Sequence, residues 1–172
     1  MFKANLEDIY PLNLADELKE VGERFLYESG LISQNAKDVK QSMFNERMRQ
    51  MLLGVGTEFI LRASFVRAGF VIHEVKQGRR TINKAALRRM TVAMKTLIDS
   101  LQELFPNISH TDLAKLQDGL NAARFLRNDC VHYGFEESTP GSVDAVLQAL
   151  LFIYKNFWPS QVRNGALVFN WT

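Results

Sequence analysis

Residues 109–134 read SHTDLAKLQDGLNAARFLRNDCVHYG, and they predict one long amphipathic helix. Apolar side chains recur three or four positions apart, which places them on one face of a helix. They are Leu113, Leu116, Leu120 and Ala123. We expect the helix to begin at Ser109 or Thr111, where Asp112 would suit the positive end of the helix dipole. The next position of the stripe is Arg127, so a guanidinium is predicted where the helix faces the protein interior.

The rest of the chain divides into further predicted helices, because all four prolines fall at plausible helix boundaries. These helices are expected over about 13–29, from 35 or 45 to 68, over 83–105 and over 142–157, with a loop at 134–141. The predicted fold is therefore all-α: an up-and-down bundle of about five helices in a single domain over 1–172. Its core would span about 45–158, followed by a tail at 159–172.

Two local features qualify this bundle. Gly54 and Gly56 interrupt the second helix, and either a bend or a very close neighbour would explain them. In the tail, Asn164 and Gly165 stand between short apolar stretches, which predicts a small C-terminal β-hairpin.

Composition limits the class of protein. A chain of 172 residues with 47% hydrophobic side chains can bury a core without disulfides or metals. Its single cysteine suits a reducing compartment. The first eight residues carry acids where a signal peptide would be apolar, and no apolar run approaches the roughly 20 residues of a membrane span. We therefore expect a cytoplasmic protein with no membrane contact. The net charge of +2 is too mild to indicate nucleic-acid binding by itself.

Most familiar catalytic motifs are missing. The three histidines stand far apart, and Cys130 has no second cysteine to form a metal site with. There is no glycine-rich phosphate loop and no nucleophile elbow. The sequence thus predicts neither a metal nor a cofactor.

Arg127 is the residue that the helical pattern does not explain. A guanidinium on an apolar stripe is costly unless it is paired or lies in a cleft. One interpretation is a salt bridge with Glu58, Asp129 or a partner chain. The other adds His132, which lies five residues further, or about 7.5 Å and 140° along a helix. Both side chains could share a cleft only if the helix end is irregular or a second copy completes the site.

An arginine and a histidine suit RNA cleavage. The ribose 2′-hydroxyl is a nucleophile beside the scissile phosphate, so no metal is needed to generate one. A histidine that titrates near neutrality can move the protons. A planar guanidinium can hold two phosphate oxygens and stabilise the charge of the transition state.

At this point the sequence resembles the HEPN superfamily of small helical domains. That family carries an arginine, then a polar residue, then a histidine after four to six intervening positions, and here Arg127-Asn128-Asp129-Cys130-Val131-His132 matches with four. Residues 56–70 are similar to the helix that often opens these domains, with Glu58 near its start and Gly69 at its end. The order of the predicted helices agrees over roughly 45–158.

The resemblance implies a homodimer whose two motifs meet at the two-fold axis and cleave RNA without metal, as toxins or antiviral defence factors do. Arg127 would contact the scissile phosphate, His132 would transfer protons and Asn128 would orient the substrate or its own neighbours. Glu58 and Tyr133 would support them. An antitoxin or another defence-system partner could regulate such an enzyme. Other members of the family have lost catalysis, so a non-catalytic nucleotide-binding or protein-interaction module is the alternative, and a plain helical scaffold is a third.

A basic cluster opens the predicted helix at 83–105. Its members are Arg79, Arg80, Lys84, Arg88 and Arg89. Cations at a helix N-terminus oppose its dipole, so an anionic partner such as RNA would explain them. A solvated face paired with nearby acids is the other explanation.

Overall fold

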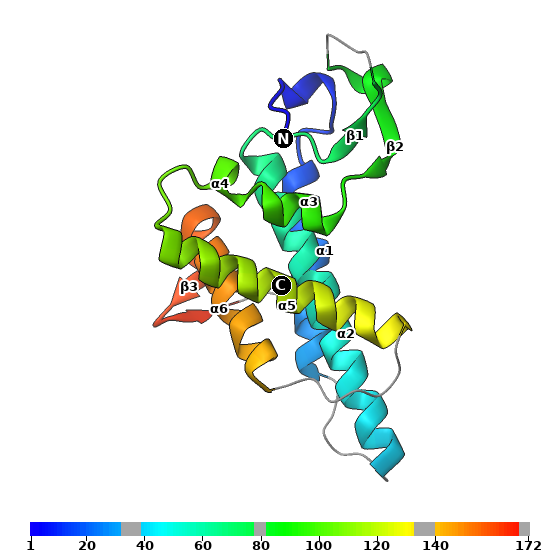
Figure 1. The fold of residues 1–172 in the computed structure, drawn as a ribbon, viewed down its shortest axis with the longest axis vertical. Coiled ribbons are helices and arrows are strands. Elements are labelled where there is room, and N and C mark those ends of the chain that lie inside the picture. The colour runs from blue at the N-terminus through cyan, green and yellow to red at the C-terminus, as the bar shows by residue number, and fades with distance from the viewer. Residues whose placement is uncertain (32–38, 78–81, 133–139, 169–172) are drawn as a thin grey trace.

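Helix α2, Val39–Arg67, is the central element of the fold (Figure 1). The structure, a computed structural model, describes residues 1–31, 39–77, 82–132 and 140–168. Helix α1 (Leu14–Leu31) lies beside α2, and helix α5 (His110–His132) crosses α2. Helix α6 (Pro140–Phe157) packs on α5. The structure is 69% helical, which confirms the predicted all-α class.

The helix predicted over 83–105 is wrong in its first half. Residues 84–86 form a 3-10 turn, and β2, Leu87–Thr91, pairs antiparallel with β1, His73–Val75. Pairing with β1 overrides the helical spacing there. Met90, which that spacing places on the apolar face of the predicted helix, is 65% exposed. Helical structure resumes in α3, Met94–Asp99, and α4, Leu101–Leu104, where the remaining apolar positions of the pattern are buried.

Close packing explains the two glycines of α2. The helix is continuous through both, so neither glycine breaks it. A Cβ on Gly54 would lie 2.5 Å from the carbonyl oxygen of Ala123 and 2.8 Å from the amide nitrogen of Arg127. A Cβ on Gly56 would lie 2.9 Å from the carbonyl oxygen of Gly22. Helix α2 therefore touches α5 through one glycine and α1 through the other.

The predicted apolar stripe of α5 is confirmed, since Leu116, Leu120 and Ala123 are all buried. Helical spacing also predicts a buried position for Phe44 near the start of α2, but this side chain is exposed. The spacing places Val21 of α1 and Leu147 of α6 on apolar stripes as well, and both are exposed instead. They lie at the margins of their stripes, where the spacing alone does not decide which side meets the core.

The tail contains the predicted hairpin. Strands β3, Val162–Arg163, and β4, Ala166–Leu167, pair antiparallel across Asn164 and Gly165. Both turn residues have positive φ, 50° and 74°, as a tight hairpin turn of this type requires. No helix of the described residues is long and apolar enough to cross a membrane.

A buried carboxylate attaches the C-terminal part of the chain to α1. Glu23 accepts hydrogen bonds of 2.9 Å from the hydroxyl of Tyr154 and from Nε2 of Gln161, and it pairs with Lys19 at 2.8 Å. Burial, and then the neighbouring charge of Glu23, raise the pKa of Tyr154 far above its ordinary value. The hydroxyl therefore stays protonated and donates to the carboxylate.

Replacing Tyr154 with phenylalanine should lower the free energy of unfolding by about 2 kcal/mol, because a hydrogen bond to a charged group is lost. Urea denaturation at neutral pH measures this. The wild-type chain should also lose stability as the pH rises above about 10, since tyrosine ionises more readily in the unfolded chain. The phenylalanine variant should lack the part of this loss that comes from position 154. Equal stability of the two proteins at neutral pH would contradict the prediction.

Candidate functional site

Arg127 and Glu58 are brought together where α5 crosses α2. Nη1 of Arg127 donates to Oε2 of Glu58 in a close ion pair. The two helices approach closely here because Gly54, one turn before Glu58, has no side chain to separate them. Of the counter-ions predicted for Arg127, the structure thus places Glu58 against it.

Arg127 keeps unused hydrogen-bond donors. Its Nε donates to Oδ1 of Asn128 at 3.0 Å, and one N–H of Nη1 goes to Glu58. A guanidinium has five N–H donors, so three of them have no partner among the described residues. The side chain is 30% exposed. Burial lowers the pKa of Arg127, but a guanidinium keeps its charge at neutral pH. The group can therefore still hold an anion.

Glu58 is shared with a second arginine that the sequence reasoning missed. Nε and Nη2 of Arg62 lie 3.2 and 2.6 Å from Oε1 of Glu58. Among the side chains that the structure describes, two guanidiniums and one carboxylate leave one positive charge at this crossing. The signal in the sequence was the spacing of Glu58 and Arg62, four residues apart on a largely apolar helix.

Helix α5 continues without a break through His132. An irregular helix end therefore does not bring His132 to Arg127, and the two positions diverge by about 140° around the helix axis. Position 132 instead lies two turns beyond Phe125, within about 20° of it, and the ring of Phe125 is 52% exposed. The side chain of His132, and Tyr133 as a whole, lie outside what the structure describes.

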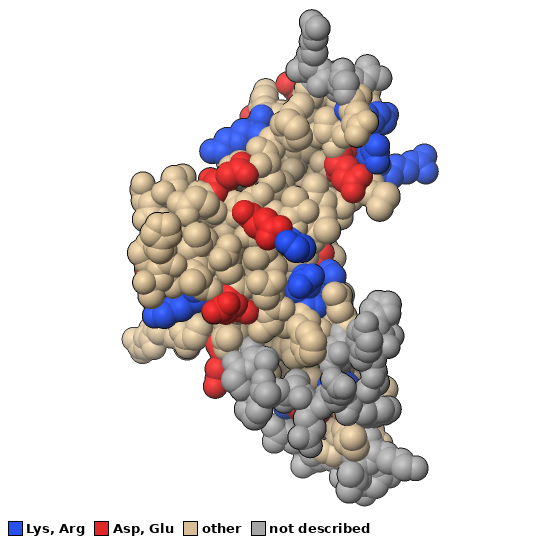
Figure 2. All heavy atoms as spheres, viewed as in Figure 1, with Lys and Arg blue, Asp and Glu red and all other residues tan. Residues whose placement is uncertain are grey.

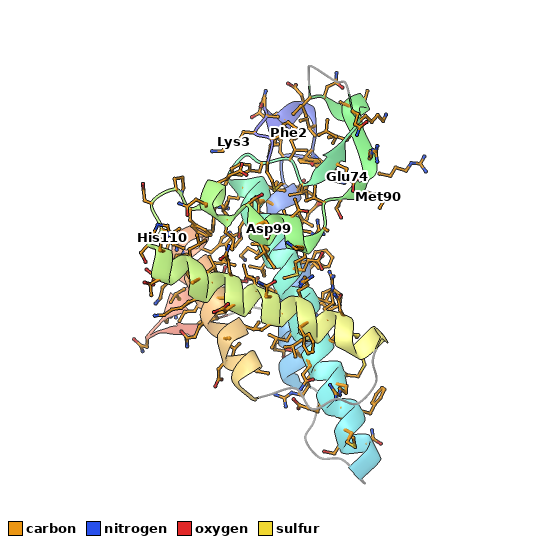
Figure 3. The ribbon with its side chains drawn as sticks, viewed as in Figure 1. Phe2, Lys3, Glu74, Met90, Asp99 and His110 are labelled. Atoms are coloured by element: carbon orange, nitrogen blue, oxygen red, sulfur yellow. The ribbon has the colours of Figure 1, made fainter. Side chains whose placement is uncertain are left out.

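The predicted basic cluster lies on the two-stranded ribbon β1–β2 rather than on a helix. Lys84 precedes β2, and Arg88 and Arg89 belong to it, so the argument from a helix dipole does not apply. Arg88 pairs with Glu74 at 3.3 Å, whereas Lys84 and Arg89 have no partner among the described residues. Cations gather over this ribbon in Figure 2, and Figure 3 shows Glu74 and Met90 on it. Arg79 and Arg80 lie outside the described residues.

His73 belongs to a separate polar contact. Its Nδ1 lies 2.8 Å from the hydroxyl of Tyr10, which accepts a hydrogen bond of 3.1 Å from the amide of Ile72. Because the hydroxyl is already an acceptor, its own proton is available to a neutral imidazole. Burial, and then the charge of Arg62, lower the pKa of His73. Arg67 and His73 also fall within the motif's range, with five intervening residues where Arg127 and His132 have four, but Arg67 pairs with Asp16 at 3.6 Å.

The lowered pKa of His73 predicts a stability that falls in weak acid. Between the folded-state pKa and the unfolded value of 6.5, the unfolded chain binds more protons. The contribution of His73 to the free energy of unfolding is therefore complete above about pH 6.5, and it is lost as the pH falls toward the folded-state pKa. His73→Gln should flatten this part of the pH profile, while His110→Gln, at an exposed site, should not. Urea midpoints between about pH 7.5 and 5 measure it, and parallel profiles for wild type and His73→Gln would contradict it.

Metal ligands do not gather in the part of the chain that the structure describes. No group of three His, Cys, Asp or Glu side chains comes together there. No protein-family model, no curated protein and no solved structure matches this chain.

Proposed function

We propose that the chain is a metal-independent endoribonuclease of the HEPN type, acting in the cytoplasm as a homodimer. The observation that carries the proposal is the state of Arg127, which lies on the same helix as His132. Its guanidinium is partly exposed, three of its donors have no partner among the described residues, and the described side chains of its cluster carry one excess positive charge.

The chemistry needs only groups that RNA and the chain supply. The 2′-hydroxyl loses its proton to a base and its oxygen attacks the neighbouring phosphorus. The bond from phosphorus to the 5′-oxygen breaks, and that oxygen takes a proton from an acid. The products are a 2′,3′-cyclic phosphate and a 5′-hydroxyl. His132 would serve in proton transfer, while the free N–H groups of Arg127 would hold the phosphate and stabilise its added negative charge. Asn128 would keep the Arg127 guanidinium in place.

A second copy would complete the site. Since α5 is regular, positions 127 and 132 lie about 140° apart around its axis, and each residue would meet its complement on the other chain. The exposed ring of Phe125, on the same face of α5 as position 132, would provide an apolar contact for that copy.

The cations of the ribbon would hold the RNA backbone. Lys84 and Arg89 carry charge without a partner among the described residues, and phosphate contacts of this kind position a nucleic acid without reading its sequence. The outline of the molecule in Figure 2 is indented below the ribbon, on the side where the C-terminal half of α5 lies in Figure 1. An RNA strand lying in this indentation would reach both the cations of the ribbon and Arg127.

Incubation of the purified chain with RNA in EDTA tests the proposal. We expect cleavage that leaves 2′,3′-cyclic phosphate ends. A matched oligonucleotide with a single 2′-deoxyribose at the cleaved position should resist cutting at that position only. No cleavage of any RNA, or equal cleavage of the deoxy-substituted position, would remove the proposal.

The ion pair of Arg127 with Glu58 supports a second candidate, a non-catalytic module of the same fold that binds nucleotides or a protein. In that case RNA would bind in a salt-dependent manner and remain intact. Expression in cells distinguishes a toxin or defence role from this second candidate. Overexpression of the wild type should arrest growth, overexpression of His132→Ala should not, and a co-expressed antitoxin would relieve the arrest.

A further inference from the structure

Arg62 is a charged side chain that the proposed chemistry does not use, and only 9% of it is exposed. Its Nε and Nη2 donate to Oε1 of Glu58, and Nη2 also donates to the carbonyl of Val92 at 2.9 Å. Val92 directly follows β2. Arg62 therefore joins three elements: its own helix α2, the end of the ribbon, and the carboxylate that holds Arg127.

Stability alone does not account for this arginine. A buried guanidinium loses much of its hydration, and an apolar side chain of similar volume is often neutral or stabilising in its place. Nη1 of Arg62 is also buried without a partner among the described residues. The energetic cost is explained if Arg62 fixes the orientation of Glu58.

The two arginines divide the carboxylate between them. Arg62 takes Oε1 and Arg127 takes Oε2. A carboxylate alone with an arginine favours a two-point fork that uses two N–H groups of the guanidinium. With Oε1 held by Arg62, Glu58 contacts Arg127 through a single nitrogen. The rest of the Arg127 fork is then left for a phosphate.

We propose that Arg62 is the positioning residue of this site: it anchors Glu58 so that Arg127 keeps a free fork and an excess positive charge for the scissile phosphate. The inference rests on the proposed ribonuclease function and adds a residue to it. Arg62 acts through Glu58 and does not contact RNA.

Arg62→Met should lower kcat for RNA between about 10-fold and 100-fold, the scale of a misplaced catalytic group. Without Arg62, Glu58 closes its fork on Arg127 and withdraws the N–H groups that the phosphate needs. Arg62→Lys, which keeps the charge but not the planar fork, should fall between wild type and Arg62→Met.

The decisive variant removes both partners. Adding Glu58→Gln to Arg62→Met frees Arg127 again, so the double variant should recover activity to within a few-fold of Glu58→Gln alone. If Arg62 had only a structural role, losing a second buried polar contact would not restore the activity that Arg62→Met lacks. Circular dichroism confirms that each variant is folded, and if Arg62→Met is not, the comparison is made between Arg62→Lys and Arg62→Lys with Glu58→Gln.

The outcomes separate this inference from the function on which it rests. If wild type cleaves RNA but the Arg62 variants match it, or the double variant is no better than Arg62→Met, the inference is overturned and the function stands. If wild type cleaves nothing, the function fails, and NMR of the Arg127 Nε–H tests the positioning by itself. That signal, assigned by its loss in Arg127→Lys, should shift in Arg62→Met, and an unchanged signal would overturn the inference.

Discussion

Arg127→Ala is expected to reduce the rate of RNA cleavage about a thousandfold, the usual loss when a donor to the developing negative charge is removed. The variant also leaves Glu58 paired with Arg62 alone, so the excess positive charge of the site disappears. Initial rates on a defined oligonucleotide in EDTA measure the change. Lys115→Ala removes one positive charge from the same helix, on the side that packs near α6, and should retain the wild-type rate.

A mixing experiment tests whether the site is composite. Chains carrying Arg127→Ala and chains carrying His132→Ala should each be inactive. In a mixed dimer, the intact arginine of one chain meets the intact histidine of the other. Random pairing gives half mixed dimers, each with one intact site of two, so about a quarter of the wild-type activity should return. His110→Ala, at the first residue of α5 (Figure 3), is the matched histidine control and should stay active alone. No recovery in the mixture would contradict a shared site.

Gly54→Ala should lower the free energy of unfolding by about 3 kcal/mol, at the upper end of what overpacking costs. The added methyl group would lie 2.5 Å from the carbonyl oxygen of Ala123, and a backbone atom cannot rotate away as a side chain would. Helix α5 must move, and Arg127 moves with it, so cleavage should fall as well. Urea denaturation and the cleavage assay measure the two effects.

Gly30 offers the matched control on α1. A Cβ there meets none of the described residues within 4 Å, so Gly30→Ala should raise stability by up to about 1 kcal/mol through helix propensity alone. The two identical substitutions are thus expected to act in opposite directions. A stabilising Gly54→Ala would show that the α2–α5 crossing is looser than the structure has it.

Helical spacing was enough to predict the main helices. The stripe of Leu116, Leu120 and Ala123 gave the buried face of α5, and the Asn-Gly pair gave the C-terminal hairpin. The ribbon could not be found in this way. Residues 87–91 keep the three-four spacing of a helix, and only their pairing with His73–Val75, a contact distant in sequence, makes them a strand.

The site was predictable to the extent that it depends on one helix. Arg127 was singled out because it continued an apolar stripe, and Glu58 was already a candidate counter-ion. Arg62 was not, because its i, i+4 spacing from Glu58 also describes an ordinary surface pair. Only the crossing of α5 over α2 distinguishes a shared, buried carboxylate from that common arrangement.

The two glycines of α2 have a mechanical consequence. They stand on nearly opposite sides of one helix and set its backbone directly against the backbones of α1 and α5. A side-chain interface can absorb a small displacement by changing rotamers, but backbone-to-backbone contact leaves no such slack. A displacement of α1 should therefore be transmitted through α2 to α5, and to the guanidinium that α5 carries, with little reduction in its size.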